Sequence, residues 1–249
     1  MNQEVAIVTG AARGIGYAIG RAMALQGIEV VLAGNMPDLQ KQKADELCRM
    51  GYRVRAVELD VTSQASVGQM VDEVVHRVGM PTILVNNAGA DTIKPFMDTV
   101  ESEWWSTLDV NLMGAMRCSH AVIPHMQAKQ YGRIVNIGSD AGRVGTSGQV
   151  VYSAAKAGLI GFSKALAREV VSFGITINTV CPGPTNTPLV DDILAKPHPR
   201  LYQALERSIP MKRFAEPDEI VPPVLMFISR TASYLTGQTV SASGGLTMM

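Results

Sequence analysis

The chain turns sharply at Thr9-Gly10-Ala11-Ala12-Arg13-Gly14-Ile15-Gly16, between the apolar run Val5–Thr9 and a segment whose apolar residues recur every three or four positions. Glycine permits a positive φ and lets a phosphate approach the backbone without a Cβ in the way. A helix that begins near Gly14 would direct free amides and the positive end of its dipole toward a pyrophosphate. Tight turns also need glycine for steric reasons, but a strand before and a helix after favour a dinucleotide-binding turn.

Short apolar runs alternate with longer amphipathic segments along nearly the whole chain. The runs are apolar throughout rather than alternating, which is typical of strands covered on both faces. The expected strands are Val5–Thr9, Glu29–Ala33, Arg53–Glu58, Thr82–Asn86, Arg133–Gly138, Thr176–Cys181 and Thr239–Ala242. This pattern predicts a single α/β domain over residues 1–249, a doubly wound parallel sheet of about seven strands with helices on both faces.

The charge of the chain is balanced, with 22 basic and 22 acidic residues among 249. No long-range attraction to nucleic acid or to an acidic membrane is therefore expected, and no apolar run approaches the roughly 18 residues of a membrane span. Cys48, Cys118 and Cys181 are too widely spaced for a disulfide framework or a metal cluster, and the histidines show no ligand spacing. Because residues 1–4 also lack a basic, signal-like composition, we expect a cytoplasmic protein without a metal site.

Six prolines fall in the segment from Pro182 to Pro210. A proline removes a backbone donor and restricts the residue before it, so no continuous helix is expected there and we predict an irregular segment. Since it follows the carboxyl end of an expected strand, we predict that residues 184–210 form a substrate lid, with a plain surface excursion as the alternative. Its basic side chains fit an anionic substrate or, equally, a solvated face; they are Lys196, His198, Arg200 and Arg207.

Tyr152 and Lys156 stand four residues apart at the start of a helical pattern, so they share one helix face. A free tyrosine has a pKa of about 10 and is a poor base at neutral pH. A neighbouring ammonium favours the phenolate, which predicts a lowered pKa for Tyr152 and a role as the acid or base that moves the substrate's proton. The same spacing also occurs on solvated helices, where such a pair is idle.

Two further residues are candidates for the same chemistry. Ser139 follows the strand Arg133–Gly138, so its hydroxyl should emerge at the carboxyl edge of the sheet and could donate a hydrogen bond to a substrate oxygen. Alternatively, it simply ends a strand. Asn111 lies inside the expected helix Glu101–Met126, where its amide could bond a neighbouring carbonyl and loosen the helix.

Together these motifs resemble those of the short-chain dehydrogenase/reductase family. The matches follow the family's order and cover essentially the whole chain; they are Thr9–Gly16, Asp60-Val61, Asn86-Asn87-Ala88-Gly89, Asn111, Ser139, Tyr152 with Lys156, and Pro182-Gly183. The resemblance implies a Rossmann-type fold, a homotetramer, and an oxidoreductase that transfers a hydride between a nicotinamide cofactor and a carbonyl or secondary alcohol. It also implies that Asn111, Ser139, Tyr152 and Lys156 are catalytic, with the asparagine holding a water of a proton relay.

The resemblance further implies the cofactor contacts. Lys156 would bond the nicotinamide ribose, Asp60 would bond the adenine amino group with Val61 beside the ring, and Thr185 and Thr187 would hold the carboxamide and pyrophosphate. The cofactor-binding residues that we expect are Gly10, Arg13, Gly14, Ile15, Gly16, Asn35, Asp60, Val61, Asn87, Gly89, Tyr152, Lys156, Thr185 and Thr187.

The end of the second expected strand bears on the choice of cofactor. An acid there usually selects NAD, but Gly34 occupies this position, so no carboxylate would repel a 2′-phosphate. Arg13 stands where relatives that bind NADP often carry a base, although Asn35 replaces an arginine that is common in them. We therefore favour NADP over NAD; an Arg13 that merely faces solvent in an NAD enzyme is the alternative.

Different parts of the sequence resemble enzymes that act on two different classes of substrate. Tyr152–Glu169 resembles 3-oxoacyl-carrier-protein reductases, whereas Ser139–Arg143, Cys181–Thr185 and Ser243–Met248 look like hydroxyacyl-CoA dehydrogenases acting on cyclic acids. We expect a small-molecule substrate, either a 3-oxoacyl thioester or a cyclic ketone. The alternatives are a sugar or polyol dehydrogenase of the same family and, in a different class, a catalytically silent nucleotide-binding sensor.

Overall fold

The computed structural model describes residues 4–249 and contains the predicted parallel sheet. Its seven strands lie in the order β3-β2-β1-β4-β5-β6-β7, and every neighbouring pair is parallel. The strands are β1 Val5–Thr9, β2 Glu29–Gly34, β3 Val54–Glu58, β4 Ile83–Asn86, β5 Gly132–Ile137, β6 Ile175–Pro182 and β7 Thr239–Ala242. All seven expected strands are confirmed. Residues 1–3, part of the segment whose composition was used to predict location, lie outside the described residues.

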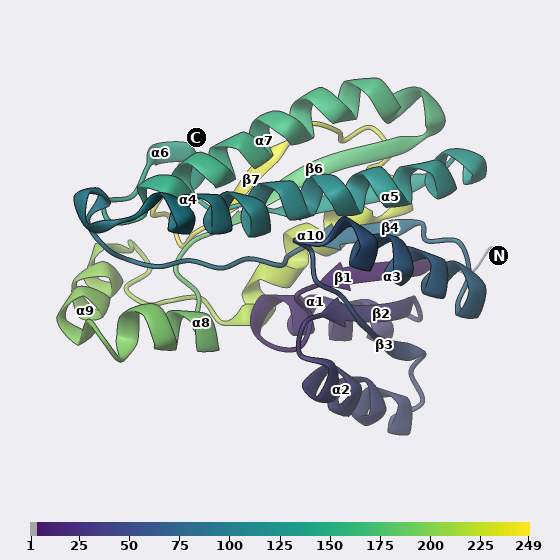
Figure 1. Cartoon of the computed structure of the whole chain (residues 1–249), viewed down its shortest axis with the longest axis horizontal. Coiled ribbons are helices and arrows are strands. Elements are labelled where there is room, and N and C mark those ends of the chain that lie inside the picture. The colour runs from purple at the N-terminus through teal and green to yellow at the C-terminus, as the bar shows by residue number, and fades with distance from the viewer. Residues whose placement is uncertain (1–3) are drawn as a thin grey trace.

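Helices cover both faces of this sheet (Figure 1). The α-helices are α1 Gly14–Leu25, α2 Pro37–Arg49, α3 Gln64–Arg77, α4 Glu101–Leu108, α5 Gly114–Lys129, α6 Ala141–Val144, α7 Val150–Val170, α8 Pro188–Val190, α9 Pro199–Ser208 and α10 Val221–Ile228. Side chains of α1, α2 and α10 form the core on one face, and those of α3, α5 and α7 form the core on the other. No helix within residues 4–249 combines the length and the apolar character that crossing a membrane requires.

Residues of β1 alternate between the two cores. Ala6 and Val8 pack with α1 and α10, whereas Val5 and Ile7 pack with the opposite set of helices. Every residue of this strand is buried because neither face of the sheet is open to solvent. The double covering is the physical reason for the continuous apolar runs in the sequence.

The strand order reverses between β1 and β4, and the glycine-rich turn lies at this point. Ala6 pairs with Ile83 and Val8 with Val85, so the residues that follow both strands emerge side by side at the carboxyl edge. Open α/β sheets bind their ligands in the crevice at such a switch point. The fold therefore brings the glycine-rich turn and the Asn87-Ala88-Gly89 segment to one place.

Two expected segments differ from the structure. The helix expected over Glu101–Met126 is divided into α4 and α5 by a π-helical turn, Asp109–Met113, and α5 continues to Lys129. The segment 184–210 is more regular than expected, because Pro188 and Pro199 occupy the first positions of α8 and α9, where a helix does not need the missing N–H. The predicted lack of a continuous helix is confirmed, but the predicted irregularity was wrong.

A buried polar network ties the middle of the sheet to α7. Asn86 on β4 donates to the Asn136 Oδ1 on β5 at 2.8 Å, and Asn136 in turn donates to the Ser163 Oγ on α7 at 2.7 Å. The Thr179 hydroxyl on β6 donates to the same Ser163 oxygen at 3.1 Å. Ser163 is thus the acceptor for two buried donors.

Replacement of Ser163 by alanine should lower the free energy of unfolding by about 1–3 kcal/mol, because the Asn136 amide and the Thr179 hydroxyl would each lose a partner away from water. Urea unfolding at one fixed protein concentration measures the effect. Ser102→Ala, at an exposed site on α4, is the matched control and should change stability by less than about 0.5 kcal/mol. Equal stability of the two variants would contradict the assigned role of the network.

Candidate active site

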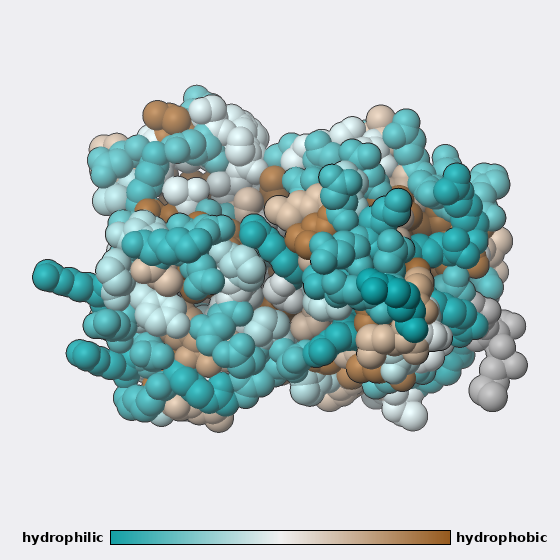
Figure 2. Space-filling view, turned by 90° about the horizontal axis from the view of Figure 1, so that it is seen from below, coloured by the Kyte–Doolittle hydropathy of each residue, from teal (hydrophilic) through white to brown (hydrophobic). Residues whose placement is uncertain are grey.

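The carboxyl ends of the central strands open into a cavity of about 670 Å³. Twelve of the expected site residues line it: Gly10, Arg13, Gly14, Ile15, Asn35, Asn87, Gly89, Ser139, Tyr152, Lys156, Thr185 and Thr187. Apolar side chains of the segment 184–210 form another part of the wall, namely Leu189, Val190, Ile193, Leu194 and Leu205. Figure 2 shows the surface hollowed between the end that holds α8 and α9 and the end that holds α1 and α2. The fold therefore gathers residues from distant parts of the sequence around one space.

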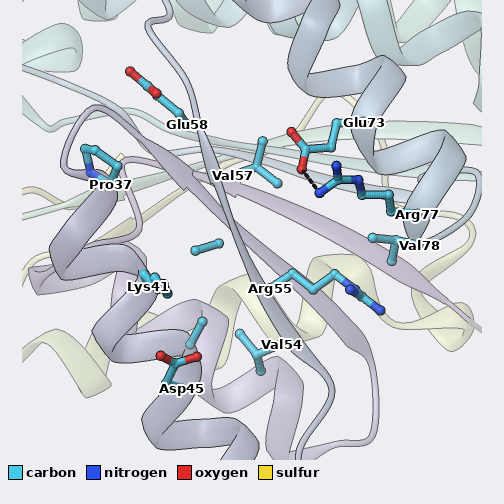
Figure 3. Close-up of a pocket in the computed structure, with 12 residues that line it drawn as sticks. Pro37, Lys41, Asp45, Val54, Arg55, Val57, Glu58, Glu73, Arg77 and Val78 are labelled. Atoms are coloured by element: carbon cyan, nitrogen blue, oxygen red, sulfur yellow. Dashed lines mark hydrogen bonds and ion pairs between the residues drawn. The ribbon is translucent and has the colours of Figure 1, made fainter.

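A second cavity, of about 430 Å³, lies over the edge strand β3 between α2 and α3 (Figure 3). Its charged lining is balanced, with Lys41, Arg55 and Arg77 beside Asp45, Glu58 and Glu73. None of the expected site residues lines this cavity. Within residues 4–249, no cluster of histidine, cysteine, aspartate or glutamate side chains could hold a metal ion. The first cavity is therefore the candidate site.

The glycine-rich turn lines this cavity, and no side chain caps the start of the helix that follows it. Gly10 and Gly14 have φ values of +64° and +56°, a backbone conformation that residues with a side chain rarely adopt. Arg13 precedes the first turn of α1, and no side chain caps that helix end. The first amides of α1 are thus available to an anionic ligand. These features fit the pyrophosphate of a dinucleotide.

Gly16 serves packing rather than the ligand. A Cβ there would lie 2.4 Å from the Asn87 Nδ2 and 2.6 Å from the Gly10 carbonyl oxygen. Asn87 needs this space, because its Nδ2 donates to the carbonyl oxygens of Thr9 at 2.9 Å and Gly10 at 3.2 Å. Gly16 does not line the cavity, so its expected cofactor contact stays a prediction, whereas its support of the turn is seen in the structure.

Ser139, Tyr152 and Lys156 come together at the ends of β5 and α7. Ser139 follows β5, as expected, and its hydroxyl is hydrogen-bonded to that of Tyr152. The Lys156 Nζ lies 5.6 Å from the centroid of the Tyr152 ring and donates to the Ile137 carbonyl oxygen at 2.9 Å. Tyrosine and lysine therefore share one helix face beside the serine, as their spacing predicted.

The predicted acidity of Tyr152 was wrong for this structure. Burial and, less strongly, the Asp91 carboxylate raise the pKa of the Tyr152 phenol, whereas its hydrogen bond to Ser139 lowers that pKa. Burial also lowers the pKa of Lys156 to about 8. The loss of hydration therefore holds Tyr152 as the neutral phenol.

Asn111 is buried within the π-helical turn between α4 and α5. Its Nδ2 donates to the carbonyl oxygens of Ala90 at 2.7 Å and Thr107 at 2.9 Å. The expected local loosening of the helix by this amide is confirmed. A Cβ on Gly89 would lie 3.0 Å from the Asn111 Oδ1 and 3.8 Å from the Lys156 Nζ, so the asparagine lies close to the lysine. Its Oδ1 is buried without a hydrogen-bond partner in the structure.

The structure does not bring Asp60 and Val61 to the lining of the cavity. The Asp60 Oδ1 accepts hydrogen bonds from the backbone N–H and the hydroxyl of Thr62, at 2.9 and 2.7 Å, and so holds the turn before α3. Thr185 and Thr187 do line the cavity. The Thr185 hydroxyl donates to the Gly183 carbonyl oxygen at 2.9 Å, and the Thr187 hydroxyl caps α8.

Gln40, on α2, supports the end of β2. This residue was not identified from the sequence. It is fully buried; its Nε2 donates to the carbonyl oxygens of Leu32 at 3.0 Å and Val57 at 3.1 Å, and its Oε1 accepts from the Met36 N–H. The amide thereby fixes the turn that carries Gly34 and Asn35. A glutamine on a polar helix face gives no sequence signal of such burial.

Two further polar groups on the cavity wall were also missed. Asp91 follows the Asn87–Gly89 segment and accepts a hydrogen bond from the Gln149 amide. Asp140, next to Ser139, accepts from the Ser241 hydroxyl, and Arg143 donates to the same hydroxyl at 2.7 Å. A single acid within an irregular stretch could have been noticed only after the strand order was known.

Comparisons with known proteins agree with this geometry over the whole chain. A family model described as enoyl-(acyl carrier protein) reductase matches residues 10–247. The chain is 36% identical to a 3-oxoacyl-acyl-carrier-protein reductase of Aquifex aeolicus, over 98% of this chain and 97% of the relative. It is 35% identical to the oxidoreductase UcpA of Escherichia coli, over 98% of this chain and 95% of the relative.

Solved structures show the same architecture. An actinorhodin polyketide ketoreductase, solved with NADPH, superposes with a TM-score of 0.93 at 32% identity, over 98% of this chain and 97% of that one. The glycine-rich turn with a free helix end, the Ser139–Tyr152–Lys156 group and these full-length matches agree with one another. The chain therefore belongs to the short-chain dehydrogenase/reductase family, and it is an NAD(P)-dependent oxidoreductase that acts on a carbonyl group.

Proposed function

We propose that this protein is an NADPH-dependent reductase of 3-oxoacyl thioesters. The proposal rests on the interacting hydroxyls of Ser139 and Tyr152, which line the same cavity as the apolar side chains of the segment 184–210. An acyl chain would be compatible with that wall, which includes Leu189, Ile193 and Leu205. The names of relatives that reduce 3-oxoacyl groups and polyketides support the same substrate class.

Each catalytic side chain has a distinct role in this proposal. The bound nicotinamide would supply the hydride, while the Ser139 and Tyr152 hydroxyls donate hydrogen bonds to the substrate's carbonyl oxygen. Tyr152 then gives its proton to that oxygen as negative charge develops. Lys156, charged below its pKa of about 8, offsets the charge left on the phenolate. Asn111, close to Lys156, would hold a water that returns the proton.

The raised pKa of Tyr152 favours the neutral phenol. A neutral phenol can donate a proton throughout the physiological pH range, whereas oxidation requires the phenolate, which burial disfavours. In this structure Tyr152 is therefore in the protonation state that reduction of a carbonyl requires.

The cofactor would lie across the switch point between β1 and β4. The free amides of α1 would hold the pyrophosphate, and Thr187 lies beside them, since a Cβ on Gly14 would be 3.3 Å from the Thr187 Cγ2. Thr185 lines the same cavity. Arg13 and Asn35 line the cavity, and Gly34 at the end of β2 places no acid against a 2′-phosphate. We propose NADP on this basis. Asp60, with Val61, stays a predicted adenine contact, because neither residue lines the cavity.

The remaining expectations concern organisation. We propose one catalytic domain whose segment 184–210 covers the substrate, a cytoplasmic location, and a homotetramer. Exposed apolar residues support assembly: Trp105 on α4 is 65% exposed, Tyr234 is fully exposed, and Val240 lies on the edge strand β7. Light scattering after gel filtration would measure the mass of the assembly.

Replacement of Tyr152 by phenylalanine should lower kcat for thioester reduction by about 10²–10⁴-fold, because the proton donor is lost while the ring remains. Reduction is followed by the absorbance of NADPH, and cofactor binding by its fluorescence. The affinity for NADPH should change by less than about twofold. Tyr234→Phe, at an exposed site, is the control and should retain full activity. Comparable activity of the two variants would contradict the role of Tyr152.

Replacement of Arg13 by alanine should raise the Kd for NADPH by about tenfold, since one charge-assisted contact to the 2′-phosphate would be lost. The Kd for NADH should stay within about twofold of the original. Arg21→Ala is the matched control. Arg21 lies on α1, the helix that follows Arg13, and it does not line the cavity. Equal weakening of both cofactors by Arg13→Ala would refute the phosphate contact.

Introduction of an acid at Gly34 should shift the cofactor preference of the enzyme from NADPH toward NADH. A Cβ there would lie 3.4 Å from the Gln40 Oε1, which is an ordinary contact, so Gly34→Asp should fold. Its carboxylate should weaken the binding of NADPH at least about tenfold more than the binding of NADH, because it repels the 2′-phosphate. Unchanged selectivity would place the 2′-phosphate elsewhere.

A further inference from the structure

The wall of the cavity carries an acid for which the proposed mechanism has no use. Asp91 lies two residues beyond Gly89 and lines the cavity together with Ser139, Gln149 and Tyr152. Its carboxylate is half-buried, so it is accessible from the cavity but poorly hydrated. A charged group in this position must influence which substrates can enter.

Only neutral groups hold this carboxylate. The Gln149 Nε2 donates to its Oδ2, and the Thr92 backbone N–H donates to its Oδ1 at 2.8 Å. Among residues 4–249, no basic side chain forms an ion pair with Asp91. Asp140, the other acid on the wall, has a basic residue nearby. The Ser241 hydroxyl donates to Asp140 and accepts a hydrogen bond from Arg143. Neither acid forms a direct ion pair among residues 4–249, but Asp91 also lacks the link through a hydroxyl to an arginine that Asp140 has.

Asp91 lies within electrostatic reach of the reacting groups. Its charge raises the pKa values of both Tyr152 and Lys156, for each of which burial is the largest influence. Lys156 is the nearest opposing charge on α7, but it is only 3% exposed and its Nζ bonds the Ile137 carbonyl oxygen. From the cavity, the carboxylate is therefore the more accessible of the two charges.

The position of the substrate follows from the hydroxyls that bind it. A carbonyl oxygen between Ser139 and Tyr152 fixes the reacting carbon, and the C1 carbon of a 3-oxoacyl group is two bonds away. Whichever direction C1 takes, a carboxylate at C1 would enter the field of Asp91 in a partly dehydrated space. Like charges repel strongly there, whereas a thioester at C1 carries no charge.

We propose that Asp91 is a specificity-determining residue that excludes free 3-oxo acids and admits their neutral thioesters. This inference rests on the proposed function, which it deepens by naming the form of the substrate. The Gln149 amide keeps the carboxylate on the wall and leaves its charge intact. Repulsion by a fixed charge is a direct way to discriminate two ligands of similar shape.

Selectivity should also depend on pH with a defined sign. Burial raises the pKa of Asp91 to about 6, opposed by its hydrogen bonds from Gln149 and Thr92 and by the charge of Lys156. The other charged groups near it are the ion pair Lys94–Glu103, which shares a small neighbouring cavity with Asp91. Asp91 is thus ionised at pH 7.5 and protonates as the pH falls below about 6. A free 3-oxo acid, with a carboxyl pKa near about 4, stays ionised at pH 5.5.

The test compares acetoacetate with its N-acetylcysteamine thioester as substrates for the wild-type enzyme, Asp91→Asn, and Asp98→Asn as an exposed control. The ratio of kcat/KM for thioester over acid is measured at pH 7.5 and 5.5 with NADPH. Asp91→Asn should lower this ratio at least about tenfold at pH 7.5, chiefly by raising activity on the acid. Lowering the pH should reduce the ratio for the wild-type enzyme and for Asp98→Asn but not for Asp91→Asn.

A binding measurement separates this inference from the proposed function. Calorimetry compares 3-hydroxybutyrate with its methyl ester, each titrated into the protein saturated with NADP, for wild type and Asp91→Asn. Absence of thioester reduction by the wild-type enzyme would refute the proposed function, and the calorimetric ratio would still test Asp91. An ester-over-acid affinity ratio that is the same in both proteins, or a kcat/KM ratio unchanged by Asp91→Asn, would overturn the inference.

Discussion

The contact between Asn87 and the turn after β1 holds the site together. The Asn87 side chain donates to the Thr9 and Gly10 carbonyl oxygens, while the Thr9 hydroxyl accepts from the backbone N–H groups of Asn87 and Ala88, both at 3.0 Å. These bonds join two loops that are 78 residues apart in the chain. One loop presents the free amides of α1, and the other continues to Asp91. Both walls of the crevice therefore depend on this one junction, and the absence of side chains at Gly10 and Gly16 makes room for it.

Burial, more than pairing of charges, governs the titration of the reacting groups. Removal from water favours the uncharged form, and this one effect raises the pKa of Tyr152 and Asp91 and lowers that of Lys156. Tyr152 stays a neutral acid, which suits the protonation of a carbonyl oxygen. Asp91 keeps its charge at neutral pH, because Gln149, Thr92 and Lys156 partly offset the effect of burial. One dehydrated space thus holds a proton donor and a fixed negative charge.

A small third hydrophobic core involves the segment 184–210 and residues beyond it. Leu194, Ile209 and Phe214 are buried against one another, with Tyr202 and Leu205 packed beside them. This cluster is separate from the two cores of the sheet. Ile93, which follows β4, and Leu246, which follows β7, also pack against this cluster, so it joins the segment to loops at the carboxyl edge of the sheet. Its basic residues Lys196, His198 and Arg200 are exposed and do not line the cavity, so they fit the solvated-face interpretation.

The sequence by itself determined the parallel sheet, the glycine-rich turn and the shared helix face of Tyr152 and Lys156, because these depend on local periodicity and spacing. Only the tertiary structure decided the burial of Asn111, the support of Gly34 by Gln40 and the place of Asp91 beside Tyr152. It also reversed the expected direction of the Tyr152 pKa shift. Hydration and long-range contacts set these properties, and neither can be read from neighbouring residues in the chain.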